Sequence, residues 1–293
     1  MRAEEGYSGS GISGGLKKGP LLFYTDALET GHGKMEKLTQ QIEQRLCAVT
    51  GDACFYYENL ATGANFGRAA DKPVVAASVI KLAVLIEAFR QMDADIVRAN
   101  EMFTVARTDK LPSCGALNYL HDGLCVTFRD LCVLMIILSD NTATNLLIKR
   151  LGIGNINDTL RTLGAEQTTL NRLLFDSEAS ARGIENYVTA QEAGLLLKRL
   201  YDGEAVSGPA SADMLSILKD QRLNGKIPFL LPHSVKIAHK TGEDDGITHD
   251  VGIVYARQPF IVCFCGEHVS APEFERAMQD ITLMLYENAE RLR

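Results

Sequence analysis

The chain has 293 residues, of which 46% are hydrophobic and 23% charged, and 30 basic against 37 acidic side chains give a formal net charge of −7. This length allows one two-lobed unit with a sizeable core. The acidic balance argues against a nucleic-acid-binding protein, which needs a basic face to displace phosphate counterions. No apolar run approaches the roughly 18–20 residues of a membrane-spanning helix, so we expect no membrane span.

Residues 1–33 are expected to form a flexible tail. Glycine and serine dominate residues 6–20, and such a composition cannot bury enough apolar surface to offset the cost of ordering the chain. Met1–Glu5 carries both charge signs, and no apolar stretch of about 7–15 residues follows, so no secretory signal is expected. Leu21–Tyr24 is the one patch of the tail suited to dock on the body.

Seven cysteines make an odd count, so at least one thiol stays unpaired within a monomer. Cys263 and Cys265 are not expected to bridge each other, because we place them on opposite faces of one strand. Buried free thiols in a reducing compartment fit best, which favours a cytoplasmic protein. The alternative is a secreted or periplasmic protein whose signal has been removed.

Apolar residues at helical spacing predict an amphipathic helix that ends before Gly51: Met35, Leu38, Ile42 and Leu46. A hairpin is predicted next, with strands at 53–58 and 64–67. Residues 71–224 are expected to be mostly helical. Their clearest helix starts resemble capping boxes, Thr127 with Asp130 and Thr189 with Glu192.

Strand patterns return near the C-terminus, at 235–241, 250–256 and 260–265, and a helix from about Pro272 closes the chain. Strands at both ends, with helices between them, predict one sheet built from both ends and covered by the terminal helices. The resulting α/β lobe comprises 34–70 and 225–293, and an all-helical lobe comprises 71–224. A groove between the lobes of this single unit is the expected site.

Ser78 and Lys81 stand at the start of an almost wholly apolar helix, 82–89. Residues three apart share a helical face, so the two side chains can touch. A lysine on a buried helix is desolvated, which favours its neutral form and suits it to act as a base. Backbone N–H groups at the helix start can stabilise an oxyanion. Alone, the pair is better explained by a helix cap followed by a lysine that extends to solvent.

Two further polar triplets lie where one predicted helix or strand ends. Ser139-Asp140-Asn141 separates two apolar helices, 128–138 and 142–151, and Lys240-Thr241-Gly242 ends an alternating strand. Each triplet alone is consistent with an ordinary cap or a strand that runs into a glycine turn.

Taken together, in this order and on these elements, the three motifs resemble those of class A β-lactamases and penicillin-binding proteins. The resemblance extends from about residue 34 to the C-terminus, and Ser139–Leu147 with His239–Gly242 carries most of its specificity. It implies an α/β fold with an antiparallel five-stranded sheet flanked by N- and C-terminal helices, plus an inserted helical lobe. It also implies a serine hydrolase that forms an acyl-enzyme with β-lactams or D-Ala-D-Ala-type amides.

Carried over residue by residue, the resemblance implies that Ser78 is the nucleophile and that Lys81 is the base that takes its proton. Ser139 would pass a proton to the leaving nitrogen. Lys240 would support that proton path and attract an anionic group of the substrate.

The resemblance also implies a set of substrate-binding residues: Asn141, Thr241, Gly242 and Glu243. Asn141 would hold the substrate amide, and the backbone N–H groups of Ser78 and Glu243 would form the oxyanion hole. Asp140 and Asn145 match positions that are structural in the family.

The loop after the second motif departs from the family. Residues 168–172 look like the run that leads to the deacylating glutamate of class A β-lactamases, and counting on from Arg172 places Leu174 at that position. A leucine cannot accept a proton, so we expect slow deacylation, as in small penicillin-binding proteins related to class A enzymes. Three nearby carboxylates are either substitutes from a rearranged loop or ordinary loop carboxylates: Asp176, Glu178 and Glu185.

The residues after Lys-Thr-Gly also depart from the family, which usually has a hydroxyl residue there and often an arginine on the next strand. Here three carboxylates occupy 243–245. They would repel a substrate carboxylate, so we expect a substrate that lacks this group or carries positive charge there. The alternative is that these acids point to solvent in a turn.

His239 and His249 show no metal-ligand spacing with the cysteines, so we expect a structural role for them and neither a metal nor a cofactor. Cys114 matches the loop that lines the cleft mouth in the family, although an ordinary loop thiol is the preferred interpretation. The expected molecule is a monomer that acts on a small-molecule or peptide amide. The alternatives are an intracellular serine amidase or esterase for another substrate, and a β-lactam sensor or binding protein.

Overall fold

The computed structural model describes residues 32–291. The expected tail, 1–33, with its patch Leu21–Tyr24, lies almost wholly outside the described residues, whose first helix begins at His32. Within residues 32–291, no helix is both long enough and apolar enough to cross a membrane.

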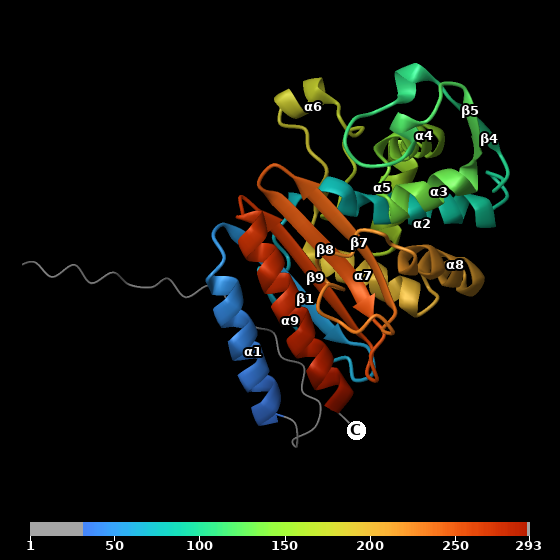
Figure 1. Cartoon of the computed structure of the whole chain (residues 1–293). Helices are drawn as coiled ribbons and strands as arrows, with labels where there is room; N and C mark the ends of the chain where they lie inside the picture. The colour runs from blue at the N-terminus through green and yellow to red at the C-terminus, as the bar shows by residue number, and fades with distance from the viewer. Residues whose placement is uncertain (1–31, 292–293) are drawn as a thin grey trace, which may run out of the picture.

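A five-stranded antiparallel sheet is built from both ends of the chain, in the order β2-β1-β9-β8-β7. Its strands are β1 (Asp52–Asn59), β2 (Asn65–Arg68), β7 (Ile237–Asp244), β8 (Ile247–Val254) and β9 (Phe260–Glu267). The terminal helices α1 (His32–Cys47) and α9 (Ala271–Arg291) lie side by side over one face (Figure 1). The predicted fold class is therefore confirmed.

The sheet separates two cores, because successive side chains of a strand point to opposite faces. Phe55, Phe264 and Phe274 belong to the core beneath the terminal helices. Cys263 and Cys265 both belong to the larger core on the opposite face. The prediction that they face opposite ways is therefore wrong, since residues two apart on a strand share a face. All seven cysteines lie in the described residues as free thiols.

The larger core continues into the helical lobe, where the central helix buries most of its side chains. The lobe contains α2 (Lys81–Asp93), α3 (Phe128–Ile137), α4 (Asn141–Leu151), α5 (Ile153–Thr162), α6 (Ser177–Ala181), α7 (Ala190–Tyr201) and α8 (Gly208–Lys219). Short 3₁₀ turns interrupt it at η1 (Ala77–Ile80), η2 (Arg107–Asp109) and η3 (Leu117–Tyr119).

Two small antiparallel pairs also lie within the stretch predicted to be mostly helical. β3 (Val74–Val75) pairs with β6 (Tyr187–Val188), and β4 (Met102–Val105) pairs with β5 (Leu124–Thr127). Strands this short leave no periodic pattern, and their partners are distant in sequence, so local sequence reasoning misses them.

Residues 243–245, the acidic run after Lys-Thr-Gly, lie in a β-hairpin. The predicted strands, 235–241 and 250–256, had left these residues in a loop between them. β7 and β8 continue their ladder until Asp244 pairs with Ile247. The turn is Asp245-Gly246, and Gly246 has φ +67, a conformation that favours glycine. Glu243 and Asp244 are therefore held on a strand.

One predicted capping box is complete and the other is not. Thr127 and Asp130 each bond the other's backbone N–H at the start of α3. Thr189 caps α7 by accepting from the Glu192 N–H at 3.0 Å. The Glu192 carboxylate instead accepts the backbone N–H groups of the preceding loop, at Gln167 and Thr168.

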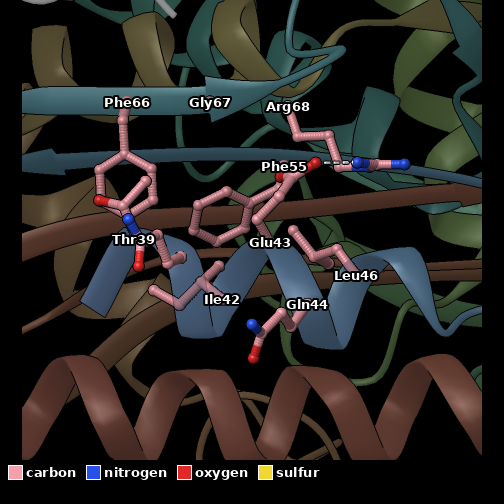
Figure 2. Close-up of a pocket in the computed structure, with 10 residues that line it drawn as sticks. Thr39, Ile42, Glu43, Gln44, Leu46, Phe55, Phe66, Gly67 and Arg68 are labelled. Carbon is pink, nitrogen blue, oxygen red and sulfur yellow. Dashed lines mark hydrogen bonds and ion pairs between the residues drawn. The ribbon is translucent and has the colours of Figure 1, made fainter. Parts of the chain in front are cut away.

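An apolar groove of about 340 Å³ opens between α1 and the β1–β2 edge of the sheet. Ile42 and Leu46 from α1 face Phe55 and Phe66 across it, as Figure 2 shows. None of the sequence motifs contributes to its lining.

Candidate active site

Ser78 and Lys81 are in contact, as their spacing predicts. Lys81 Nζ lies 2.8 Å from Ser78 Oγ. Ser78 sits on the 3₁₀ turn η1, not on the first turn of the α-helix, and Lys81 begins α2. A 3₁₀ turn aligns residues three apart, which brings the two side chains together. Ala77, just before the serine, has φ +41, an uncommon conformation that directs the chain into this turn.

The Lys81 amine is completely buried among oxygen atoms. Besides the serine hydroxyl, it lies 2.8 Å from the Ser139 carbonyl, 2.9 Å from Ser139 Oγ and 2.9 Å from Asn141 Oδ1. Burial, and next the charge of Lys240, hold the pKa of Lys81 well below its usual value. A neutral amine has a lone pair, so this nitrogen can take the proton of the serine hydroxyl.

Ser139 connects the two lysines. Its hydroxyl oxygen lies 2.9 Å from Lys81 Nζ and 3.1 Å from Lys240 Nζ. The residue has φ +54, so the chain turns sharply between α3 and α4 to place this side chain. The three motifs therefore meet at a single hydroxyl group.

Asp140 holds the junction by accepting three backbone N–H groups. Its carboxylate bonds Ala143 N at the start of α4 and, across the cleft wall, Ala116 N and Leu117 N. Gly115 permits the close approach, because a Cβ there would lie 2.4 Å from the carboxylate and its φ is +116. The geometry agrees with the structural role that the resemblance implies for Asp140.

Lys240 is also fully buried, on β7. Its ammonium group donates to the Thr241 carbonyl at 2.7 Å. Burial lowers the pKa of Lys240 to about 7, against the smaller opposing effect of the Asp250 carboxylate. Two lysines with lowered pKa values on either side of a serine hydroxyl make a proton path that can operate near neutral pH.

The end of β7 packs against the turn that carries the nucleophile. A Cβ on Gly242 would lie 3.3 Å from Ser78 N, which is tighter than most Cβ contacts, so the lack of a side chain helps the strand to come this close. Thr241 is buried, and Glu243 follows at the cleft edge. The backbone of β7 and the Ser78 N–H therefore face the same small space.

Ser78 lines a cleft of about 530 Å³. It is lined by both lobes, including Ser78, Asn141, Glu243 and Asp244. Cys114 also lines it, at the place that the resemblance implies for its loop, although the preferred interpretation was an ordinary loop thiol. Asp245 does not line the cleft and points to solvent in the hairpin turn.

Leu174 lines the same cleft and is held by Asn145. The Asn145 amide donates to the Leu174 carbonyl at 2.9 Å, and its oxygen accepts the Leu174 N–H at 2.9 Å. This double hydrogen bond fixes the backbone of Leu174 beside α4.

The carboxylates near Leu174 have partners of their own. Asp176 caps α6 by accepting from Ala179 N at 2.9 Å. Glu185 forms an ion pair with Arg172, whose Nε donates to it at 2.9 Å. Both acids line the cleft, while Glu178 is exposed on α6 and does not.

Lys226 is a site residue that sequence reasoning missed. It is nearly buried behind the end of β7, where Nζ donates to the His249 carbonyl at 3.1 Å and lies 2.9 Å from a Glu243 oxygen. Glu275 on α9 is 3.9 Å away. No motif surrounds this lysine in the sequence, and only the return of the loop onto β7 brings it here.

Of the two histidines near the site, His239 bonds Asp250 at 2.9 Å and Asn224 at 3.0 Å, whereas His249 lies beneath Gly242. Across residues 32–291, no group of three His, Cys, Asp or Glu side chains is arranged to hold a metal ion.

Comparison with known proteins agrees with this geometry. Residues 37–289 match the family described as the β-lactamase enzyme family. β-Lactamase CTX-M-97 of Escherichia coli is 26% identical over 240 residues, which cover 80% of this chain and 81% of the relative.

Two solved structures are also similar. A β-lactamase from Sphaerobacter thermophilus is 27% identical with a TM-score of 0.80, covering 88% of this chain and 98% of that one. PBP-A is 28% identical with a TM-score of 0.79, covering 87% and 97%. The chain belongs to the β-lactamase enzyme family of serine hydrolases.

Proposed function

We propose that this protein forms an acyl-enzyme through Ser78 with β-lactams or D-Ala-D-Ala-type amides and releases the acyl group slowly. The observation that carries the proposal is the buried, pKa-lowered Lys81 amine 2.8 Å from the Ser78 hydroxyl. A desolvated amine at hydrogen-bond distance is the arrangement that converts a weak serine nucleophile into an effective one.

In acylation, Lys81 takes the proton as Ser78 Oγ attacks the carbonyl carbon. The carbonyl oxygen then becomes negatively charged, and the N–H groups of Ser78 and Glu243 stabilise it. As the C–N bond breaks, the leaving nitrogen receives a proton from Ser139, and Ser139 in turn receives from Lys81, 2.9 Å away, the proton that came from Ser78. Lys240, 3.1 Å from that hydroxyl, supports the transfer.

Substrate binding is assigned to the edges of the same space. The Asn141 side chain, which also contacts Lys81 and the Pro112 carbonyl, would hold the substrate amide. The β7 edge at Thr241 and Gly242 would lie along the other side of the substrate.

Slow release follows from Leu174. Its backbone is held beside the cleft by Asn145, and its side chain cannot activate a water molecule. Asp176 and Glu185 line the cleft but cap a helix and pair with Arg172, respectively. We therefore assign neither of them to deacylation.

One similar structure supports a β-lactam as acyl donor. It is a leucine-to-glutamate mutant of PBP-A, 27% identical to this chain, as an acyl-enzyme complex with penicillin G. The free thiols, in turn, support our proposal of a reducing, cytoplasmic location.

The substrate group next to β7 is proposed to be neutral or cationic. Glu243 and Asp244 both line the cleft, and Lys226 is compensated by Glu243 and Glu275. A substrate carboxylate at this edge would meet uncompensated negative charge.

Intact-protein mass spectrometry after mixing with penicillin G tests the proposal. We expect an adduct that persists for many minutes in the wild type and does not form in Ser78→Ala. A transient adduct would contradict slow release. If neither penicillin G nor its methyl ester, which lacks the repelled carboxylate, forms an adduct, the proposed function is contradicted and an amidase or esterase for another substrate is favoured.

A further inference from the structure

We propose that His249, on β8, is a positioning residue that sets the distance between the two N–H donors of the oxyanion hole. The inference rests on the proposed function, because it assigns those donors to Ser78 and Glu243. These residues lie on different segments, η1 and β7, so something must fix one segment against the other.

The His249 ring is held in one tautomer by two hydrogen bonds. Gly266 N–H donates to Nδ1 at 3.0 Å, so Nδ1 must be the unprotonated nitrogen. Nε2–H therefore donates to the Val75 carbonyl, 2.8 Å away. Burial lowers the pKa of His249 to about 4, which keeps the ring neutral in ordinary buffers.

Val75 leads directly into the nucleophile turn. On one edge, β3 pairs with β6, and Ala76 N donates to the Asn186 carbonyl at 2.8 Å. On the opposite edge, side chains of the main sheet hold Val75. His249 bonds its carbonyl at 2.8 Å, and Glu267 lies 3.4 Å from its N–H. Of these two, the histidine contact is the shorter.

The same ring supports β7 from below. His249 is the register partner of Gly242, and a Cβ on Gly242 would lie 3.0 Å from His249 Cδ2 and 3.3 Å from Ser78 N. Gly242 is thus enclosed between the histidine ring and the nucleophile turn. Glu243, whose N–H is the second donor, is the next residue along the strand.

One ring therefore lies against β7 and bonds Val75, the residue of β3 that leads into η1, so it links the two segments that form the oxyanion hole. Oxyanion donors act only when they lie about 2.7–3.1 Å from the developing charge, so small shifts of either segment are costly. The ring does not reach the substrate carbonyl itself. Its loss should lower the acylation rate constant and leave the affinity of the non-covalent complex almost unchanged.

The test uses the full chain with penicillin G, and rapid-quench mass spectrometry separates the acylation rate constant from the dissociation constant of the non-covalent complex. We expect His249→Leu to lower the rate constant by about 10- to 100-fold, with less than about a threefold change in the dissociation constant. His249→Gln, which can still donate to the Val75 carbonyl, should recover part of the loss. His268→Leu is the matched control, since His268 is 79% exposed in its side chain.

A folded His249→Leu variant with the wild-type rate constant would overturn the inference, as would equal losses in His249→Leu and His249→Gln. If His249→Leu fails to fold, His249→Asn takes its place, because its shorter amide cannot reach the Val75 carbonyl that Nε2 contacts. A lowered rate constant with unchanged binding then supports the role, and a wild-type rate constant contradicts it. If the wild type is not acylated, the proposed function fails. A small fluorophosphonate, which needs the same nucleophile and N–H donors, then replaces penicillin and is read by the same criteria.

Discussion

Two parts of the cleft, the residues around Ser78 and those around Leu174 and the β7 edge, differ in how completely their polar side chains are hydrogen-bonded. Around Ser78, Lys81, Ser139 and Lys240, every functional atom lies within 3.1 Å of another, and both lysines are fully buried. Elsewhere in the cleft lining, Leu174 stands beside α4, and two exposed carboxylates, Glu243 and Asp244, lie at the β7 edge. Acylation chemistry depends on the first set of residues alone, so the release step and the substrate-charge preference proposed above can vary without disturbing it.

The largest effect is expected from the residues proposed to carry out acylation. Lys81→Met removes the base while retaining an unbranched side chain, and we expect the acylation rate to fall by about 10³- to 10⁴-fold. Time-resolved mass spectrometry with penicillin G measures it. Lys149→Met, at a half-exposed lysine on α4, is the control and should acylate normally. A loss below tenfold for Lys81→Met would mean that another group is the base.

The rate of deacylation should respond to the addition of a single carboxylate. Leu174→Glu is expected to raise β-lactam turnover by about 10²-fold, because it places a proton acceptor beside the cleft on a backbone fixed by Asn145. Steady-state hydrolysis of a chromogenic cephalosporin measures the gain. Phe175→Glu, one residue further along, should give none. Unchanged turnover with intact acylation would show that Leu174 does not occupy the base position.

The lysine pair predicts a shift in the pH dependence of acylation. The rate should rise with pH as Lys81 becomes neutral, and the charge of Lys240 helps to lower the pKa of Lys81. Lys240→Met removes that charge but retains the burial, so the pKa of Lys81 should rise. The rising limb of the pH–rate profile should therefore move to higher pH. Lys240→Arg keeps the charge and should leave the limb near its wild-type position. A limb that moves to lower pH in Lys240→Met would contradict the pairing.

The smallest effect is expected at the β7 edge. We expect a D-Ala-D-Ala peptide amide to acylate faster than its free acid, and the double variant Glu243→Gln, Asp244→Asn should narrow this preference by about fivefold, as expected for exposed charges. Competition between the two peptides, read by mass spectrometry, gives the ratio. Asp245→Asn, in the exposed turn, is the control. A wild-type preference for the acid would refute the proposed selectivity.

Local patterns in the sequence predicted the elements that carry the catalytic motifs. The spacing of Ser78 and Lys81, the triplet at 139–141 and the alternating strand before Lys240 each depend on neighbours within a few residues. Helical and strand periodicities express those neighbours directly. For the same reason, the terminal helices and the five strands were found, and the complete capping box at Thr127 was recognised.

The contacts that bring these elements together join residues that are distant in the sequence. Lys226 reaches Glu243 from 17 positions away, and His249 reaches Val75 across 174 positions. The Glu192 carboxylate accepts the Thr168 N–H, 24 positions away, although a capping box with Thr189 was predicted. Such contacts depend on which strand edges and loops pack together, and local periodicity carries no information about that choice. The candidate reacting groups are thus readable from local patterns in the chain, whereas the packing of η1 against β7 and β8 sets how they are held.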